Sequence, residues 1–511
     1  MKMTGTVLSA GLFGIDGYPV QVEADMSQGL PAFDMVGFLG SEVREARERV
    51  RTALKNTGIR LPACRLTVNL SPANRRKAGN GFDLPIAVAV LIAAGLLEGE
   101  KAKGYLFCGE LGLDGALKPV HGTISVTAAA WKLGCRGCIV PSENRGEGAA
   151  LKQIPVYGFS SLREVLAFLE NPESAPEQKK GVLPEKQEVR IDFADVIGQE
   201  TGVRAAEIAA AGLHNLILTG PPGTGKSMVA QRITTILPDL TPEEQIELTK
   251  LYSVRGFSVE GLMTERPFRS PHHTISVHAM AGGGSTPIPG EISLAHCGVL
   301  FLDELPEFRP EVLEVLRQPL EEGEVRISRT HGIYRFPARM MLVAARNPCR
   351  CGYYPDRNRC RCPEQDVLRY QRRISKPLLD RIDLSVQLPE VPFSVMQSGK
   401  RGRTSAQIRA HVLEAVERQR FRTRAEGGIL NAHLTGKLLE RDALPDPAGK
   451  KLLEMLYAER SGGMRSYHKL LRIARTIADL NGREQPGEEE ISEAWYFRNA
   501  SAEPERQVIR P

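Results

Sequence analysis

A glycine-rich segment that ends in a lysine and a serine could bind the phosphate groups of a nucleotide. It lies between a short apolar run, Leu216 to Thr219, and a helical pattern, Met228 to Ile236. In such a unit the glycines let backbone N–H groups turn toward phosphate oxygens, and the start of the helix adds partial positive charge. This context favours a phosphate-binding P-loop over an ordinary turn rich in glycine and proline. The predicted nucleotide-binding residues are Gly220, Pro221, Pro222, Gly223, Thr224, Gly225, Lys226 and Ser227.

Two carboxylates directly follow another apolar run. The run is Val299 to Leu302, and Asp303 and Glu304 come next. Ligands of open α/β sheets bind at the carboxyl ends of strands, so these side chains would face the phosphates. We expect Ser227 and Asp303 to hold Mg²⁺ and Glu304 to act as the general base toward the attacking water. The alternative is a solvated turn, and the P-loop upstream favours the catalytic interpretation.

Two more polar side chains could act on the same phosphates. Asn347 follows the apolar run Met340 to Ala345, where an amide can orient the attacking water or contact the γ phosphate. Arg381, in Leu378-Leu-Asp-Arg-Ile-Asp383, supplies a planar cation that can neutralise charge on a transferred phosphoryl group. A surface salt bridge is the alternative for Arg381. The four motifs together predict hydrolysis of a nucleoside triphosphate.

Four cysteines lie just after Asn347. They form two C-x-C pairs, Cys349 with Cys351 and Cys360 with Cys362. Four thiolates can close around Zn²⁺, although C-x-C is tighter than the usual spacing of ligand pairs. The pattern allows either a structural zinc site or free thiols in a surface loop.

Positive charge gathers in two segments, and two histidines lie before them. The first segment is a predicted hairpin with Arg326, Arg329, His331 and Arg335, which would contact DNA phosphates without reading bases. The second extends from Lys400 to Arg424, where a solvated helix face and a DNA contact explain the charges equally well.

His272 and His273 are expected to be a hydrogen-bonded turn pair, since no further zinc ligands lie near them, and Gly282 to Gly284 are expected to form a loop.

The elements that must position these residues fall into three units. A length of 511 residues predicts about three domains. Residues 1–170 alternate short apolar runs with helical patterns, and residues 171–190 have the Pro, Glu, Lys and Gln content typical of a linker. Residues 191–393 contain apolar runs typical of parallel strands with helices on both faces. Residues 394–511 show helical patterns only, so the predicted fold class is α/β with a C-terminal helical lid domain.

The composition excludes several classes of protein. With 42% hydrophobic and 25% charged residues the chain is neither collagen-like, a coiled coil nor wholly disordered. The most apolar stretch, Leu84 to Leu97, is shorter than the ~20 residues that a bilayer requires and is predicted to be a buried helix. The N-terminus lacks signal-peptide features, so a cytoplasmic location and reduced thiols are expected. A net charge of +6 permits a polyanionic partner without requiring one.

The order of the motifs resembles that of the AAA+ ATPases. Within them, three strings are similar to the magnesium-chelatase-like family typified by bacterial YifB and ComM, and the resemblance extends over nearly the whole chain. The strings are PFRSPHHTIS at 267–276, PGEISLAHCGVLFLDELPEF at 289–308 and ARTIADL at 474–480. The resemblance implies an AAA+ P-loop sheet as the central domain, with ATP and Mg²⁺ as cofactors.

The resemblance also implies roles for individual residues. Asn347 takes the sensor 1 role, Arg381 the arginine finger and Arg465 the sensor 2 role. At sensor 2 the chain has Gly463-Met-Arg465 where the family more often has Ser-Ala-Arg. An arginine finger of this class reaches the nucleotide of a neighbouring subunit, so a homo-oligomeric ring, expected to be a hexamer, is implied.

The N-terminal domain resembles the ribosomal-S5-like fold of the Lon protease domain. That peptidase requires a serine nucleophile and a lysine base, which align here with Asp83 and Ile124. Neither side chain can perform those steps. The domain is therefore expected to be an interaction or substrate-gating module.

Three functions follow from the resemblance. The leading one is an ATP-driven ring motor acting on single-stranded or branched DNA, such as a helicase for branch migration of recombination intermediates in natural transformation or repair. The second is the motor subunit of a magnesium chelatase, against which the Lon-like domain and the lack of a D-x-S-x-S signature count. The third is a protein unfoldase or chaperone without peptidase activity.

Overall fold

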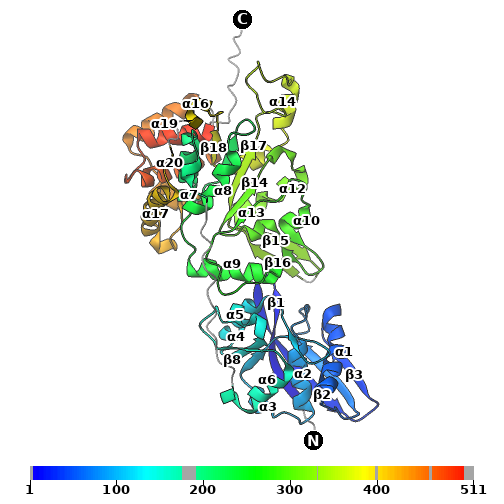
Figure 1. Ribbon diagram of the computed structural model, residues 1–511. Coiled ribbons are helices and arrows are strands. Elements are labelled where there is room, and N and C mark those ends of the chain that lie inside the picture. Colours follow the sequence, from blue (N-terminus) through cyan, green and yellow to red (C-terminus); the bar gives the residue numbers. More distant parts are fainter. Residues whose placement is uncertain (1–3, 175–190, 331, 398–400, 460–462, 500–511) are drawn as a thin grey trace.

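The computed structural model shows three regions that follow one another along the molecule (Figure 1). The structure describes residues 4–174, 191–330, 332–397, 401–459 and 463–499. The N-terminal region lies at one end, a central α/β region adjoins it, and the C-terminal helices lie beside the central sheet. Of the predicted linker, residues 175–190 lie outside the described residues, as do His331 and Lys400.

The N-terminal region is built on a seven-stranded sheet in the order β3-β4-β2-β1-β5-β8-β9. Helix α2 is buried along its whole length, which confirms the predicted buried helix. The strands are β1 (Thr4–Phe13), β2 (Asp16–Ser27), β3 (Ala32–Val36), β4 (Arg65–Ser71), β5 (Tyr105–Phe107), β8 (Gly137–Pro141) and β9 (Val156–Phe159), with a small separate pair β6 (Glu110–Leu111) and β7 (Leu117–Lys118). The helices are α1 (Ser41–Asn56), α2 (Asp83–Ala93), α3 (Gly99–Ala102), α4 (Thr123–Lys132), α5 (Arg145–Gly148) and α6 (Leu162–Glu170).

The central region is a five-stranded parallel sheet in the order β11-β14-β17-β10-β18. Its inner strands are apolar and buried on both faces, because helices cover both sides of a parallel sheet. The strands are β10 (Leu216–Thr219), β11 (Phe268–Arg269), β14 (Val299–Leu302), β17 (Met341–Arg346) and β18 (Leu384–Gln387). The helices are α7 (Glu200–Gly212), α8 (Lys226–Ile236), α9 (Pro242–Arg255), α10 (Val277–Ala281), α11 (Glu291–Leu294), α12 (Pro310–Glu314), α13 (Arg317–Glu322), α14 (Glu364–Gln371) and α15 (Lys376–Leu379).

Two hairpins project from this sheet. One, β15 (Glu324–Arg329) with β16 (Gly332–Pro337), confirms the predicted basic hairpin. The other pairs β12 (Gly282–Gly283) with β13 (Ile288–Pro289), so the glycines expected in a loop instead begin a short hairpin.

The C-terminal helices share one apolar core with the central sheet. Among residues 401–459 and 463–499 all regular elements are helical, and the predicted α/β fold class with a helical lid is confirmed. Within the described residues, no helix combines the length and apolar character needed to cross a bilayer. The helices are α16 (Phe393–Gln397), α17 (Ser405–Arg422), α18 (Gly436–Asp442), α19 (Pro447–Glu459), α20 (Met464–Leu480) and α21 (Glu488–Asn499).

The N-terminal region is fastened to the central region at two places. Ile15, in the turn between β1 and β2, is buried in an apolar cluster of the central region, and the ring of Phe13 lies 4.4 Å from that of Tyr334 on β16. Next to helix α9, the buried carboxylate of Glu147 accepts a hydrogen bond from Ser253. Burial raises the pKa of Glu147, and the hydrogen bond from Ser253 opposes that rise. These contacts connect the N-terminal region directly to the helix and hairpin beside the central sheet.

Candidate nucleotide-binding site

Three neighbouring strands deliver the predicted phosphate-binding and catalytic residues to one edge of the central sheet. Strand β10 runs into the P-loop, β14 into Asp303 and Glu304, and β17 into Asn347. All three are parallel, with β17 between the other two, so their carboxyl ends meet. We call the P-loop together with Asp303, Glu304 and Asn347 the phosphate site.

The P-loop has the backbone shape that its glycines allow. Gly223 and Gly225 have φ of 80° and 85°, in the left-handed region that favours glycine, and α8 begins at Lys226. The ammonium group of Lys226 donates to the carbonyl of Gly220 at 2.8 Å and to the amide oxygen of Asn347 at 3.1 Å. Burial lowers the pKa of Lys226, and the nearby carboxylates oppose that effect. The side chain of Lys226 is thus held next to the amide of Asn347.

Two oxygen groups lie together beside the lysine. The hydroxyl of Ser227 donates to the carboxylate of Asp303 at 2.9 Å, although the residues are 76 positions apart in the chain. Hydroxyl and carboxylate oxygens are the hard ligands that Mg²⁺ prefers, so this pair fits a magnesium ion bound with nucleotide phosphates.

Glu304 has an unusual backbone and a neighbour that the sequence did not reveal. It is one of few non-glycine residues with positive φ, at 51°, and its side chain is 56% exposed. The imidazole of His273 lies close to it, with Nδ1 3.7 Å from the carboxylate. His272 instead contacts Thr274 Oγ1 at 2.9 Å, as expected of a turn residue. His273 follows β11, and the pairing of β11 with β14 places it beside Glu304.

Arg381 and Arg465 lie together, apart from the P-loop. Both line a pocket of about 520 Å³ between the central sheet and α20, and none of residues 220–227 lines it. Arg381 is held there by Glu321 at 2.5 Å and by the carbonyl of Pro377 at 2.6 Å. We call this the arginine pocket. A nucleotide held by the P-loop of the same chain would not lie in it.

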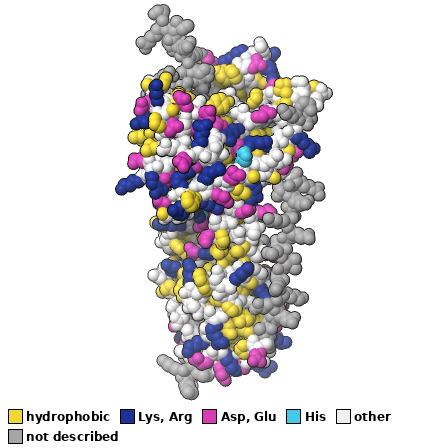
Figure 2. Space-filling view, turned by 90° about the vertical axis from the view of Figure 1, so that its left-hand side faces the viewer, with side chains coloured by type: hydrophobic (Ala, Val, Ile, Leu, Met, Phe, Trp, Pro, Cys, Tyr) yellow, Lys and Arg dark blue, Asp and Glu magenta, His cyan; other side chains and the backbone are white. Residues whose placement is uncertain are grey.

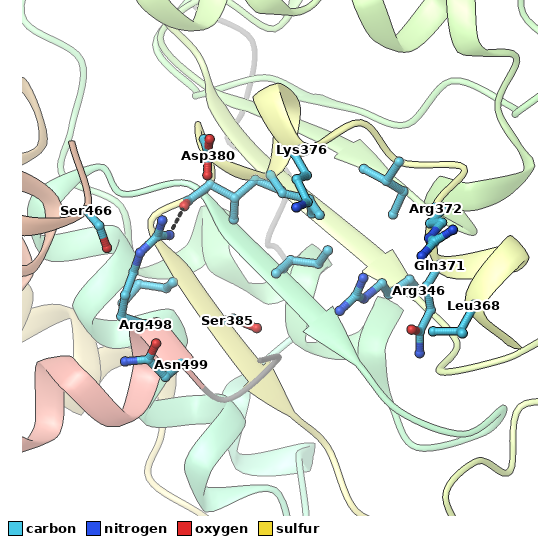
Figure 3. Close-up of a pocket in the computed structure, with 15 residues that line it drawn as sticks. Arg346, Leu368, Gln371, Arg372, Lys376, Asp380, Ser385, Ser466, Arg498 and Asn499 are labelled. Carbon is cyan, nitrogen blue, oxygen red and sulfur yellow. Dashed lines mark hydrogen bonds between the residues drawn. The ribbon is translucent and has the colours of Figure 1, made fainter. Parts of the chain in front are cut away.

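The C-terminal helices are anchored beside Arg381. Lys469 of α20 and Arg498 of α21 both donate to the backbone carbonyl of the residue after Arg381, and Figure 3 shows the bond from Arg498. Lys469 also pairs with Asp383 at 2.9 Å. Burial opposes ionisation of Asp383, but the charge of Lys469 and the neighbouring imidazole of His214, 3.8 Å away, outweigh it and hold the pKa of Asp383 well below its usual range. The lid helices are therefore attached to the two residues that directly follow Arg381.

The arginines predicted to contact DNA are exposed on the β15–β16 hairpin. Arg326 and Arg335 lie opposite each other on the two strands, and Arg326 pairs with Glu322 at 3.1 Å. Arg329 donates to the carbonyl of Gly284 at 3.1 Å. The hairpin therefore presents three guanidinium groups to solvent, with acidic neighbours that partly neutralise two of them.

The second basic segment contributes to the packing of the lid. Arg403 pairs with the buried Glu207 at 2.8 Å, and Arg422 pairs with the buried Asp479. Figure 2 shows Lys and Arg side chains lying among Asp and Glu side chains over the upper part of the face that it views. These ion pairs favour a structural role for this segment over a continuous basic track.

The four cysteines that follow Asn347 converge. Their Sγ atoms all lie within 4.8 Å of one another, and Cys349 and Cys360 are buried. Four thiol sulfurs at this separation are a donor set suited to Zn²⁺.

The two positions that align with the Lon catalytic pair have structural contacts. Asp83 pairs with Arg49 at 2.7 Å and accepts from the backbone of Leu111 at 3.2 Å. The side chain of Ile124 is fully buried, and its backbone N–H donates to Glu147 at 2.7 Å. Neither position offers the serine hydroxyl or the lysine amine that the peptidase requires.

Comparisons with known proteins agree with this architecture. The family described as magnesium chelatase, subunit ChlI, matches residues 192–396, its C-terminal family matches 402–498, and the family described as subunit ChlI of Mg-chelatase matches 22–144. The competence protein ComM of Haemophilus influenzae is 42% identical over 96% of this chain and 97% of its own length. YifB of Escherichia coli K12 is 42% identical over 95% of each chain. Lon protease 2 of Bacillus subtilis is 30% identical over 26% of each chain.

Proposed function

Because the chain belongs to the magnesium-chelatase-like AAA+ ATPase family typified by ComM and YifB, we propose that it is an ATP-hydrolysing ring motor that acts on DNA. The observation that carries ATP hydrolysis is the convergence of Lys226 with Asn347, and of Ser227 with Asp303, at the carboxyl ends of parallel strands. No single one of these contacts is distinctive, but the set matches what phosphoryl transfer requires.

Each residue of the phosphate site then has a separate task. Lys226 places a positive charge on the β and γ phosphates, while Ser227 and Asp303 hold Mg²⁺, which neutralises charge on the same oxygens. Asn347 orients the attacking water. Glu304 accepts a proton from that water as it attacks, and His273 beside it can fix the direction of the carboxylate.

The location of the arginine pocket supports a ring. Arg381 and Arg465 can stabilise a transferred phosphoryl group only if they approach a nucleotide on another copy of the chain, because their pocket contains no P-loop residue. We therefore propose that they act as arginine finger and sensor 2 across the subunit interface of a homo-oligomer, expected to be a hexamer. ATP would then bridge two subunits.

Two observations support DNA as the substrate. One is the similarity to the competence protein ComM over nearly the full length of both chains. The other is the hairpin with Arg326, Arg329 and Arg335, whose charges suit sequence-independent contact with phosphates. We propose helicase activity in branch migration of recombination intermediates. The four clustered thiols add a structural Zn²⁺ to the proposed cofactors ATP and Mg²⁺, and a cytoplasmic location stays a prediction.

A comparison of ATP turnover with different substrates tests the proposal. The protein is assayed alone and with single-stranded DNA, a forked duplex, a four-way junction, a porphyrin with Mg²⁺, or an unfolded protein, and Lys226→Ala serves as the control. Stimulation by branched DNA that weakens as salt rises is expected. Stimulation by porphyrin alone would instead support a chelatase motor, and stimulation by unfolded protein alone would support an unfoldase.

A further inference from the structure

The cysteine cluster has the dimensions of a metal site. Sγ of Cys349 lies 3.3 Å from Sγ of Cys351 and 3.7 Å from Sγ of Cys360, and the last two lie 3.6 Å apart. Four sulfurs at ~2.3 Å from one Zn²⁺ are about 3.8 Å apart in a tetrahedron. The backbone N–H of Tyr354 also donates to Sγ of Cys349 at 3.4 Å, as N–H groups do toward metal-bound thiolates. Little rearrangement is therefore needed for metal binding.

The same loop touches the phosphate site at two points. Asn347, two residues before Cys349, accepts a hydrogen bond from Lys226. Gly352 packs its backbone against Pro222 of the P-loop, since a Cβ at this glycine would lie only 2.4 Å from the proline ring. The chain segment between these two contacts contains the first C-x-C pair.

Thiols also form most of the interior of this loop. Its apolar cluster consists of Cys349, Cys360 and Val367, with Cys351, Cys362 and two tyrosines at its margin. Such a cluster is small, so with free thiols little apolar burial would fix the loop. A tetrahedral metal would join the two ends of the loop and restrict both contacts with the phosphate site.

We propose that Zn²⁺ bound by Cys349, Cys351, Cys360 and Cys362 fixes this loop, and that metal occupancy thereby controls ATP turnover by positioning Asn347 and Pro222. The inference rests on the proposed ATPase function. The cysteines are positioning residues, because they act on the reaction through Asn347 and the P-loop. A displacement of 1 Å near reacting groups can cost about 10²-fold in rate, so loss of the metal should lower kcat by that order.

The first test removes two ligands from the full-length protein. The double variant Cys360→Ser/Cys362→Ser is compared with wild type and with Cys64→Ser, a partly buried thiol of the N-terminal region. Metal content is measured by mass spectrometry, affinity with a fluorescent ATP analogue and kcat by phosphate release. We expect about one zinc per chain in wild type and Cys64→Ser. In the double variant we expect loss of zinc, retained nucleotide binding and a kcat lower by about 10²-fold.

A second test avoids the risk that the double variant fails to fold. Wild-type protein is treated with a zinc chelator, assayed, and assayed again after Zn²⁺ is restored, and reversible loss of turnover is expected. ATP-binding protein without zinc, or with iron at the cysteines, would overturn the metal assignment. Zinc removal without change in kcat would overturn the positioning role. Wild-type protein that holds zinc but binds no ATP would instead contradict the proposed ATPase function.

Discussion

The phosphate site and the arginine pocket differ in how complete they are within one chain. In the phosphate site, side chains from distant segments already contact one another, as Ser227 does with Asp303 and Lys226 with Asn347. In the arginine pocket, Arg381 is instead held by its own chain, through an ion pair with Glu321. Under the proposed function, each chain carries two half-sites, and hydrolysis requires a phosphate site from one copy and an arginine pocket from another.

Arg381→Ala should have the largest effect on turnover, because an arginine finger can supply about 10³- to 10⁵-fold in kcat. The decisive measurement mixes this variant with Lys226→Ala, which is itself expected to be inactive. Interfaces that join an intact phosphate site to an intact arginine pocket then form, and part of the turnover should return. Glu321→Gln is the matched control, because it removes the ion pair and keeps the arginine, so turnover should persist. Mixtures that stay inactive at every ratio would place Arg381 in its own chain's site.

Glu304→Gln should abolish most turnover while ATP binding persists, with a loss of about 10²- to 10⁴-fold from removal of the general base. Mixtures of variants test the two half-sites further, because Glu304→Gln and Lys226→Ala damage the same half-site. They should not restore each other, whereas Glu304→Gln with Arg381→Ala should. Glu307→Gln, which removes a nearby carboxylate paired with Arg373, is expected to leave turnover unchanged. Retained hydrolysis in Glu304→Gln would show that another group is the base.

The phosphate site was predictable because its geometry follows from local rules. Short apolar runs without alternation indicated parallel strands, and parallel strands bring their carboxyl ends to one edge. The residues after Leu302 and Ala345 were therefore expected together, and the structure places them so. The buried helix α2 was predictable for a similar reason, since Leu84 to Leu97 is the most apolar stretch of the chain.

Contacts that depend on packing between regions were not predictable. His273 looked like a turn residue, because nothing in its spacing shows that β11 lies beside β14. The shared pocket of Arg381 and Arg465 depends on where the lid helices pack, which local sequence patterns do not determine. The buried link from Glu147 to Ser253 also joins residues 106 positions apart in different regions.

Arg465→Ala is expected to lower turnover by about 10-fold, a loss of about 1.4 kcal/mol of transition-state stabilisation. The effect should be smaller than that of Arg381→Ala because Arg465 is exposed in the first turn of α20. Phosphate release by mixtures with Lys226→Ala should rise above that of either variant alone if Arg465 also acts across the interface. Failure to rise, with Arg381→Ala rescued in parallel, would separate the two arginines and assign Arg465 to its own chain.

Asp383→Asn should have the smallest effect on ATP turnover, and its main effect should be on the thermal stability of the protein. The substitution leaves the buried ammonium of Lys469 without its carboxylate, which loosens α20 from the central sheet and lowers Tm at neutral pH. The folded pKa of Asp383 lies below its unfolded value of about 3.9, so its stabilisation is complete above that pH and is lost as pH falls. The difference in Tm between wild type and Asp383→Asn should therefore be constant near neutrality and shrink in acid. Asp380→Asn, an exposed carboxylate of the same pocket, is the control and should show little difference at any pH. A Tm difference that grows in acid would contradict the predicted loss of stabilisation by Asp383 as pH falls. It would show that the ion pair with Lys469 does not anchor the lid beside Arg381.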